Sequence, residues 1–244
     1  MKLHSAFRST LLAGAFALLA LAACSQPALS DEARAVPAPK LDAPLASRPG
    51  TQTAVFAGGC FWGMQWVFEH VRGVTDVTAG YSGGAAESAH YERVGEGDTG
   101  HAESVQVRFD PSKVSYGQLL RVYFSVATDP TQLNRQGPDV GPQYRGAIFY
   151  ADPQQQGIAR AYIAQLTSAK FFAAPIVTQL VPFKAFYPAE SYHQDYARLN
   201  PDAPYIAIND APKVRRFQQL LPALFRAQPV THRAPSSTIG VQVL

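Results

Sequence analysis

The chain contains two cysteines, and Cys60 is the one whose surroundings suggest chemistry. It lies in the run GGCFWG at residues 58–63, after a short apolar segment and at the start of a predicted helix. Unpaired N–H groups and the positive dipole end at a helix start stabilise a thiolate, and such positions can lower a thiol pKa from about 8.5 to roughly 3.5–7.5. We therefore expect a reactive nucleophile with a lowered pKa. The alternative is a buried structural cysteine beside two core aromatics, Phe61 and Trp62.

The other cysteine, Cys24, closes an apolar leader. Lys2 and Arg8 precede an apolar run at residues 11–23 that has the length of a secretory signal and is short for a membrane span. Small residues directly before Cys24 make the segment resemble a bacterial lipoprotein signal. That resemblance implies cleavage of residues 1–23, diacylation of the Cys24 sulfur and stable anchoring to a membrane. An ordinary signal peptide with a chance cysteine is the alternative. Ser25 at the next position implies the outer membrane of a Gram-negative envelope, on its periplasmic side.

Composition describes a globular, nearly neutral protein. Of the 244 residues, 47% are hydrophobic and 11% aromatic, which is enough for one sizeable core. The formal net charge is +3, and it falls to +1 when Lys2 and Arg8 leave with the leader, which contains no acid. This charge excludes the electrostatic footprint of a nucleic-acid-binding protein. With Cys24 lipidated, no internal disulfide can form.

Three segments follow the leader. Residues 24–50 are rich in proline and alanine and predict a semi-stiff lipidated tether. Residues 51–228 are predicted to form one catalytic domain, and residues 229–244 a polar tail.

Within the domain, apolar periodicity predicts alternating strands and helices. Asp152 and Pro153 have the types expected at a helix start. The predicted strands cover residues 53–57, 74–81, 101–109, 144–150 and 176–182, and the predicted helices cover residues 60–71, 115–127, 152–168, 190–199 and 212–225. This order predicts an α+β fold, a two-layer sandwich of a mixed, mostly antiparallel sheet with helices.

Four separated blocks resemble the methionine sulfoxide reductase A family. The first is GCFWG around Cys60, and the others occur in the family's order over residues 52–225. They are YERV at residues 91–94 with TGHAE at 99–103, DPTQLNRQGPDVGPQYR at 129–145, and YHQDY at 192–196. The resemblance implies a ferredoxin-like core and reduction of methionine-S-sulfoxide, free or in proteins, to methionine.

The resemblance also implies roles for individual residues. Cys60 would attack the sulfoxide sulfur and Glu103 would act as the acid toward its oxygen. Tyr91 and Tyr144 would bind that oxygen, and Asp139 would act near the site through water. Phe61 and Trp62 would pack the substrate methyl group, with Tyr205 as a further lining residue. Without the family, Glu103 would be interpreted as a surface charge at a strand end and the tyrosines as ordinary half-buried residues.

The chain departs from many relatives where a recycling cysteine would stand. Residues 200–206 read NPDAPYI, so Ile206 occupies that place and no cysteine follows. The resemblance to single-cysteine members implies that Cys60 remains a sulfenic acid after one turnover and needs an external thiol. Thioredoxin, glutaredoxin with glutathione, or dithiothreitol in vitro would serve. Ala127 and Thr128 before Asp129, and Ala89 and His90 before Tyr91, are smaller departures.

Other interpretations remain open at this stage. Cys60 with His101 or His193 could form a cysteine hydrolase dyad, although Glu103 fits the family better and His193 is expected to be structural. A non-catalytic lipoprotein could instead bind methionine-rich partners through a Trp62 pocket. The sequence shows no metal-ligand spacing and no nucleotide-binding loop. We therefore expect no bound cofactor. We also expect a monomer. Its expected partners are oxidised proteins or free methionine sulfoxide, a thiol reductant protein and, through the lipid anchor, a membrane.

Overall fold

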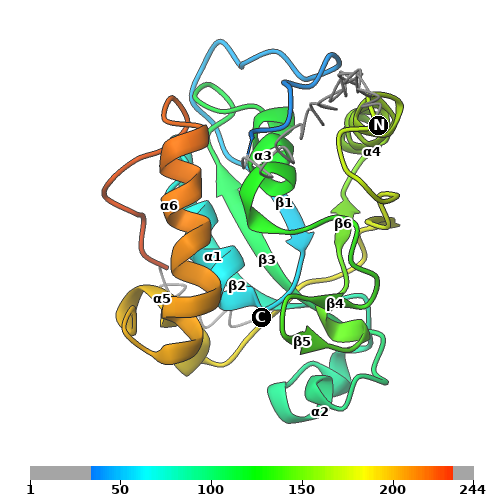
Figure 1. The fold of residues 1–244 in the computed structure, drawn as a ribbon, viewed down its shortest axis with the longest axis vertical. Coiled ribbons are helices and arrows are strands. Elements are labelled where there is room, and N and C mark those ends of the chain that lie inside the picture. The colour runs from blue at the N-terminus through cyan, green and yellow to red at the C-terminus, as the bar shows by residue number, and fades with distance from the viewer. Residues whose placement is uncertain (1–33, 233–244) are drawn as a thin grey trace, which may run out of the picture. The chain divides into compact units, whose positions relative to one another are not determined.

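A computed structural model describes residues 34–232 (Figure 1). The predicted signal peptide, the lipidation site Cys24, the start of the tether and the end of the tail lie outside the described residues. A six-stranded sheet has the order β7-β6-β1-β3-β2-β8. Its strands are β1 (Gln52–Ala57), β2 (Val74–Ser82), β3 (Ala102–Phe109), β6 (Ala147–Tyr150), β7 (Gln179–Pro182) and β8 (Tyr187–Pro188). All neighbouring strands are antiparallel except β6 and β7, which confirms the predicted mixed, mostly antiparallel α+β sheet.

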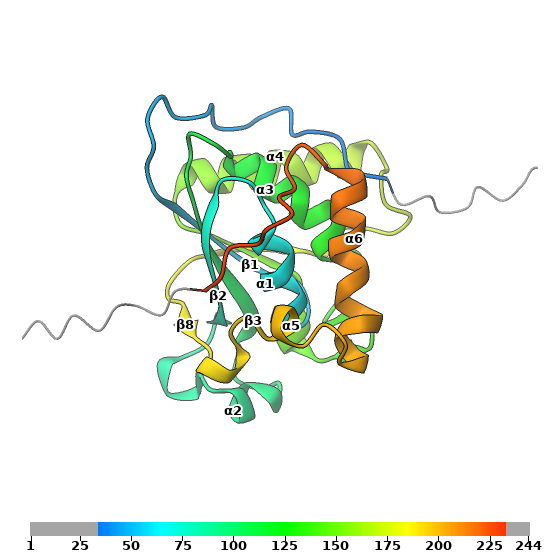
Figure 2. The same ribbon diagram turned by 90° about the vertical axis from the view of Figure 1, so that its left-hand side faces the viewer.

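Six α-helices accompany the sheet in the described part of the chain. They are α1 (Phe61–Glu69), α2 (Tyr91–Gly95), α3 (Tyr116–Val122), α4 (Pro153–Ser168), α5 (Tyr196–Leu199) and α6 (Ala211–Leu220). Two π-helical turns, η2 (Tyr123–Ala127) and η5 (Ile206–Asp210), extend α3 and precede α6. In Figure 2, α1 lies between the sheet and α6, in agreement with its many contacts to β2 and its contacts to α6.

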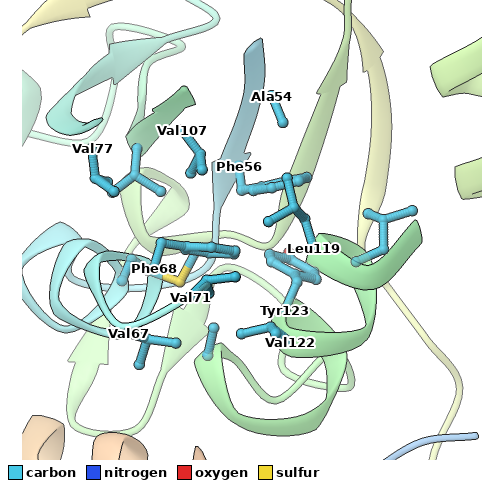
Figure 3. Close-up of a cluster of buried hydrophobic side chains, with 14 of the residues drawn as sticks. Ala54, Phe56, Val67, Phe68, Val71, Val77, Val107, Leu119, Val122 and Tyr123 are labelled. Atoms are coloured by element: carbon cyan, nitrogen blue, oxygen red, sulfur yellow. The ribbon is translucent and has the colours of Figure 1, made fainter. Parts of the chain in front are cut away.

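The main core lies between the sheet and these helices. β1 alternates, with Ala54 and Phe56 facing the helices and Val55 and Ala57 joining a smaller cluster on the opposite face. Phe56 stacks on Phe68 of α1 at 5.3 Å between ring centroids, and the cluster around it is shown in Figure 3. Burying side chains of this size contributes about 1.5–3 kcal/mol each relative to exposure, so β1 is held firmly where it leads into Cys60.

Several predicted boundaries differ from the structure. The predicted strand at residues 144–150 begins only at Ala147, because Pro142–Tyr144 form a 3₁₀ turn. The predicted helix at residues 190–199 is interrupted at Asp195, whose backbone is left-handed with φ of 56°. The unpredicted short elements include α2, β8, η5 and the hairpin of β4 (Arg135–Gln136) with β5 (Asp139–Val140).

Residues 34–50 differ from the predicted tether, because they lie against α3 and α4. Val36 is fully buried, and its backbone N–H donates to Ser125 Oγ at 3.1 Å. Tyr162 of α4 donates to the Pro37 carbonyl at 2.6 Å, and Asp42 accepts from Gly117 N at the start of α3 at 2.8 Å. Proline-rich backbone forms no internal hydrogen bonds, so its carbonyls are free to accept from the side chains of the domain.

Candidate active site

Cys60 lies at the junction of β1 and α1, as the sequence predicts. It is the N-cap residue of α1 and 8% exposed. Gly59 before it has φ of 96°, and a Cβ there would meet Gln136 Cγ at 2.5 Å. Only glycine combines this backbone conformation with so close an approach, so the turn that presents the thiol depends on it.

Glu103 of β3 reaches the same helix end. Its Oε2 accepts a hydrogen bond of 2.9 Å from the backbone N–H of Phe61, the first residue of α1. Burial raises the pKa of Glu103 to about 8, against the lowering effect of the Phe61 N–H, and the charges of Asp139 and Asp210 raise it further. The carboxyl is therefore largely protonated at neutral pH, as a general acid must be.

The pKa of Cys60 moves opposite to the sequence-based expectation. Burial of the thiol raises it well above its ordinary value, and the negative charges of Glu103 and Asp210 raise it further. The backbone N–H of Trp62 and the ammonium group of Lys213 lower it, but they do not outweigh burial. The helix-end effect predicted from the sequence is thus present, and desolvation is larger.

Four further predicted residues gather around this pair. Tyr91 begins α2, Tyr144 ends the 3₁₀ turn before β6, and Asp139 begins β5. Tyr205 precedes η5 and donates a hydrogen bond to Asp139 Oδ2. Burial raises the pKa of all three tyrosines, and the charge of Cys60 contributes in each case. The structure therefore brings the predicted tyrosines and Asp139 together near the Cys60–Glu103 pair.

The two aromatics after Cys60 have different environments. Phe61 is fully buried and packs on Tyr81, with ring centroids 5.8 Å apart. Trp62 is half-buried, stacks on Tyr196 at 4.1 Å and meets Tyr205 edge-on at 6.1 Å. Trp62 thus keeps part of its surface exposed next to Cys60, while Phe61 is enclosed in the main core.

His193 is more closely involved in the site than its sequence context predicts. Its Nδ1 accepts from Trp62 Nε1 at 3.1 Å, and its ring packs on Phe61 and on Tyr91, at 5.1 and 4.4 Å between centroids. Burial lowers the pKa of His193, so the ring is neutral and can accept. The block YHQDY was the only sequence signal for this position.

Neither histidine forms a dyad with Cys60 among the described residues. Both ring nitrogens of His101 bind backbone, since Nδ1 accepts from Gly84 N and Nε2 bonds to the Ala85 carbonyl at 2.9 Å.

Over residues 34–232 no group of three or more His, Cys, Asp or Glu side chains could hold a metal ion. No helix within residues 34–232 is long and apolar enough to cross a membrane.

Ile206 stands beside Tyr205 and is fully buried. Cys60 is the free thiol of the described residues, and the only other cysteine of the sequence, Cys24, precedes them.

Comparison with known proteins extends the resemblance over the whole domain. Residues 52–223 match the family described as peptide methionine sulfoxide reductase. The chain is 60% identical over 182 residues to the peptide methionine sulfoxide reductase MsrA 2 of Mesorhizobium japonicum, which covers 75% of this chain and 93% of that protein. It is 50% identical over 202 residues to MsrA 2 of a Synechocystis species, covering 82% of this chain and 94% of the other.

Solved structures agree with this result. The methionine sulfoxide reductase A of Corynebacterium diphtheriae aligns with a TM-score of 0.55 at 32% identity, covering 72% of this chain and 93% of that one. Reduced Mxr1 from Saccharomyces cerevisiae aligns with a TM-score of 0.56 at 30% identity, covering 67% and 92%.

Proposed function

The chain belongs to the peptide methionine sulfoxide reductase family and is a peptide-methionine (S)-S-oxide reductase, and from this premise we propose that Cys60 is its nucleophile and Glu103 its acid. The observation that carries the proposal is the hydrogen bond from Phe61 N to Glu103 Oε2, because it fixes the carboxyl at the helix end that bears the thiol. A nucleophile for sulfur and a proton donor for oxygen are the two groups that sulfoxide reduction requires.

In the proposed reaction, one oxygen atom moves from the substrate sulfur to the sulfur of Cys60. The Cys60 sulfur attacks the sulfoxide sulfur while Glu103 gives its proton to the oxygen, and the carboxylate takes up the proton that the thiol loses. The sulfur–oxygen bond of the substrate breaks, and the oxygen, released as hydroxide, bonds to the Cys60 sulfur. The bond between the two sulfur atoms breaks in this step, so methionine leaves and Cys60 becomes a sulfenic acid. Substrate sulfur gains two electrons and Cys60 sulfur loses two. The raised pKa of Cys60 is consistent with a thiol that gives up its proton only when substrate occupies the site.

The surrounding residues would select and orient the substrate. The hydroxyls of Tyr91 and Tyr144 bind the oxygen, and Asp139 assists through water and through its bond to Tyr205. Phe61 and Trp62 pack the methyl group.

Recycling would use an external thiol. Ile206 is buried where a resolving cysteine could stand, so a reductant forms a mixed disulfide with Cys60 and releases water, and a second thiol frees the enzyme. Thioredoxin or glutaredoxin with glutathione supplies these thiols in the proposal, and no bound cofactor takes part.

We propose the cell envelope as the place of action, with the mature chain a monomer anchored through lipid on Cys24 at the periplasmic side of the outer membrane. Support comes from the basic start, the apolar run and the small residues before Cys24. Incorporation of labelled palmitate in wild type but not in Cys24→Ala would support this location, and equal labelling would contradict it.

Intact-mass analysis tests the chemistry. One equivalent of methionine-S-sulfoxide without reductant should add one oxygen to the protein, and dimedone should trap it on Cys60. Cys60→Ser should do neither, and the R epimer should leave wild type unchanged. An intramolecular disulfide would refute the recycling scheme. An untouched S epimer under excess dithiothreitol would refute the function itself.

A further inference from the structure

Asp210 is a buried acid that the mechanism above does not use. It ends η5 and is fully buried. Its Oδ1 accepts a hydrogen bond of 3.0 Å from Nζ of Lys213, one turn later in α6. Its Oδ2 is also buried and has no hydrogen-bond partner among the described residues. A buried carboxylate of this kind is costly unless something requires it.

The Asp210–Lys213 pair lies against the first turn of α1. A methyl group on Gly63, three residues after Cys60, would come within 2.0 Å of Asp210 Oδ1 and 3.0 Å of Lys213 Nζ. Gly63 therefore lets the ion pair approach the backbone of the helix that carries the nucleophile. In Figures 1 and 2, α1 and α6 run side by side, as their direct contacts also show.

Several charged or titratable groups face the reacting centre from the elements packed around it. They are Glu103 of β3, Asp139 of β5, Tyr91 of α2, Tyr144 of the 3₁₀ turn before β6, His193 of the 3₁₀ turn before α5, Tyr205, Asp210 of η5 and Lys213 of α6. Among the groups that act on Cys60, Lys213 supplies the positive side-chain charge.

We propose that Asp210 and Lys213 are positioning residues of the reductase, an ion pair placed at Gly63 to set the electrostatic environment of the Cys60 thiol and the Glu103 carboxyl. This inference rests on the proposed roles of Cys60 and Glu103. The negative charge of Asp210 opposes a second negative charge nearby and so keeps Glu103 supplied with its proton. The ammonium group of Lys213 favours the anionic form of the Cys60 sulfur and that of Asp210, against the burial that raises the pKa of Asp210.

The two members of the pair act on Cys60 in opposite directions. Asp210 raises the pKa of Cys60 and of Glu103, while Lys213 lowers that of Cys60. Nearby charges produce shifts of this sign and fall off with distance. A purely structural pair would give no such opposition, because loss of either member would loosen the same contact.

The experiment compares Asp210→Asn with Lys213→Met in the full chain. The pH dependence of iodoacetamide alkylation is followed on the Cys60 peptide by mass spectrometry between pH 7 and pH 11. We expect the apparent pKa of Cys60 to fall in Asp210→Asn and to rise in Lys213→Met, each by on the order of half a unit or more. The alkaline limb of the kcat/KM profile should also move to lower pH in Asp210→Asn, because Glu103 then loses its proton earlier.

Asp110 and Lys113 offer a matched control. They form an ion pair with the same three-residue separation in sequence, and Lys113 Nζ lies 3.5 Å from Asp110 Oδ2. Asp110 is buried and directly follows β3. Asp110→Asn and Lys113→Met should leave both profiles in place even where they lower stability. Lys213→Arg keeps the positive charge at this position and should therefore keep the wild-type pH profile.

The outcomes separate the inference from the function on which it rests. Shifts of the same sign in both variants, or none in either while wild type reduces the S epimer, would overturn the positioning role. Inactive wild type would instead overturn the proposed function. Alkylation measures the environment of Cys60 without turnover, so it remains informative for a variant that folds but does not react.

Discussion

The backbone N–H of Phe61 donates a hydrogen bond of 2.9 Å to Oε2 of Glu103, which joins the first residue of α1 to the second residue of β3. The proposed acid therefore lies where helix-end N–H groups can stabilise a carboxylate. Burial favours the protonated carboxyl before proton transfer, and this N–H stabilises the anion afterwards. Burial thus favours the acid, and the contact with Phe61 favours its anion.

Glu103→Gln tests this balance. The glutamine side chain keeps an oxygen that accepts from Phe61 but cannot give a proton, so kcat/KM should fall on the order of 10²–10⁴-fold. The loss of activity above about pH 8 in wild type, where Glu103 ionises, should disappear from the residual rate. Steady-state assays from pH 5 to pH 10 check both points. Glu96→Gln, at an exposed salt bridge in the same region, should behave as wild type. Near-normal activity of Glu103→Gln would remove Glu103 from the role of acid.

His193→Phe tests the support of Trp62. Phenylalanine keeps the ring contacts with Phe61 and Tyr91 but removes the acceptor for the Trp62 indole. Loss of one such hydrogen bond costs about 1 kcal/mol, so we expect KM to rise about five-fold with kcat little changed. The buried Nε2 has no partner in the described structure, so its removal should not lower stability. His90→Phe, at an exposed histidine, is the control. A fall in kcat with unchanged KM would instead place His193 in the chemistry.

The sequence predicted the positions of the reacting groups well, because they depend on local patterns. Two glycines after an apolar strand predicted the turn before Cys60, and alternation over residues 101–109 predicted β3. The burial of Glu103 was not predicted by this pattern, which suggested a surface charge at a strand end. The direction of the Cys60 pKa could not be predicted in this way. It depends on how completely later segments cover the thiol and on which charges they carry, as with Asp210 and Lys213.

The late part of the chain shows the same limit. The left-handed residue Asp195, which interrupts the predicted helix at residues 190–199, donates its N–H to Gln65 of α1 at 2.9 Å. A contact over so long a sequence separation has no local signature. The packing of residues 34–50 on the domain could not be predicted for the same reason. It depends on one buried valine and on hydrogen bonds to the domain, and neither produces an apolar repeat in the sequence.

Asp42→Ala tests whether residues 34–50 stabilise the domain. Asp42 accepts from Gly117 N and from Ser115 Oγ, so it closes the start of α3 together with the capping box of Ser115 and Gln118. Loss of a capping acceptor costs about 0.5–2 kcal/mol, and we expect a decrease of this size in the free energy of unfolding. Urea denaturation of the mature domain measures it. Asp202→Ala, at an exposed aspartate, should change the free energy of unfolding little. Equal stability of Asp42→Ala and wild type would mean that these residues lie on the domain without supporting it.

Glu69 of α1 is a fully buried acid that lies beside Asp195. The carboxyl of Glu69 lies against that of Asp195, which also accepts from Arg198 at 2.9 Å and from His232 N at 3.1 Å. Burial, followed by the proximity of Asp195, raises the pKa of Glu69 to about 10. Neither carboxyl oxygen of Glu69 has a hydrogen-bond partner among the described residues, so nothing offsets the cost of burying its charge. Glu69 is therefore protonated at neutral pH.

This contact predicts that stability falls as pH rises. Between the unfolded pKa of Glu69, about 4.5, and its folded value, about 10, the native state holds a proton that the unfolded state has lost. The stabilisation is complete below about pH 4.5 and declines as the pH rises toward the folded pKa of about 10. Glu103 adds a similar slope up to about pH 8. Glu69→Gln keeps the size of the side chain and does not titrate, so its free energy of unfolding should decline less steeply with pH than that of wild type. Urea denaturation at pH 5, 7 and 9 measures the slopes, with exposed Glu87→Gln expected to match wild type. Parallel curves for Glu69→Gln and wild type would show that Glu69 is ionised in the native protein.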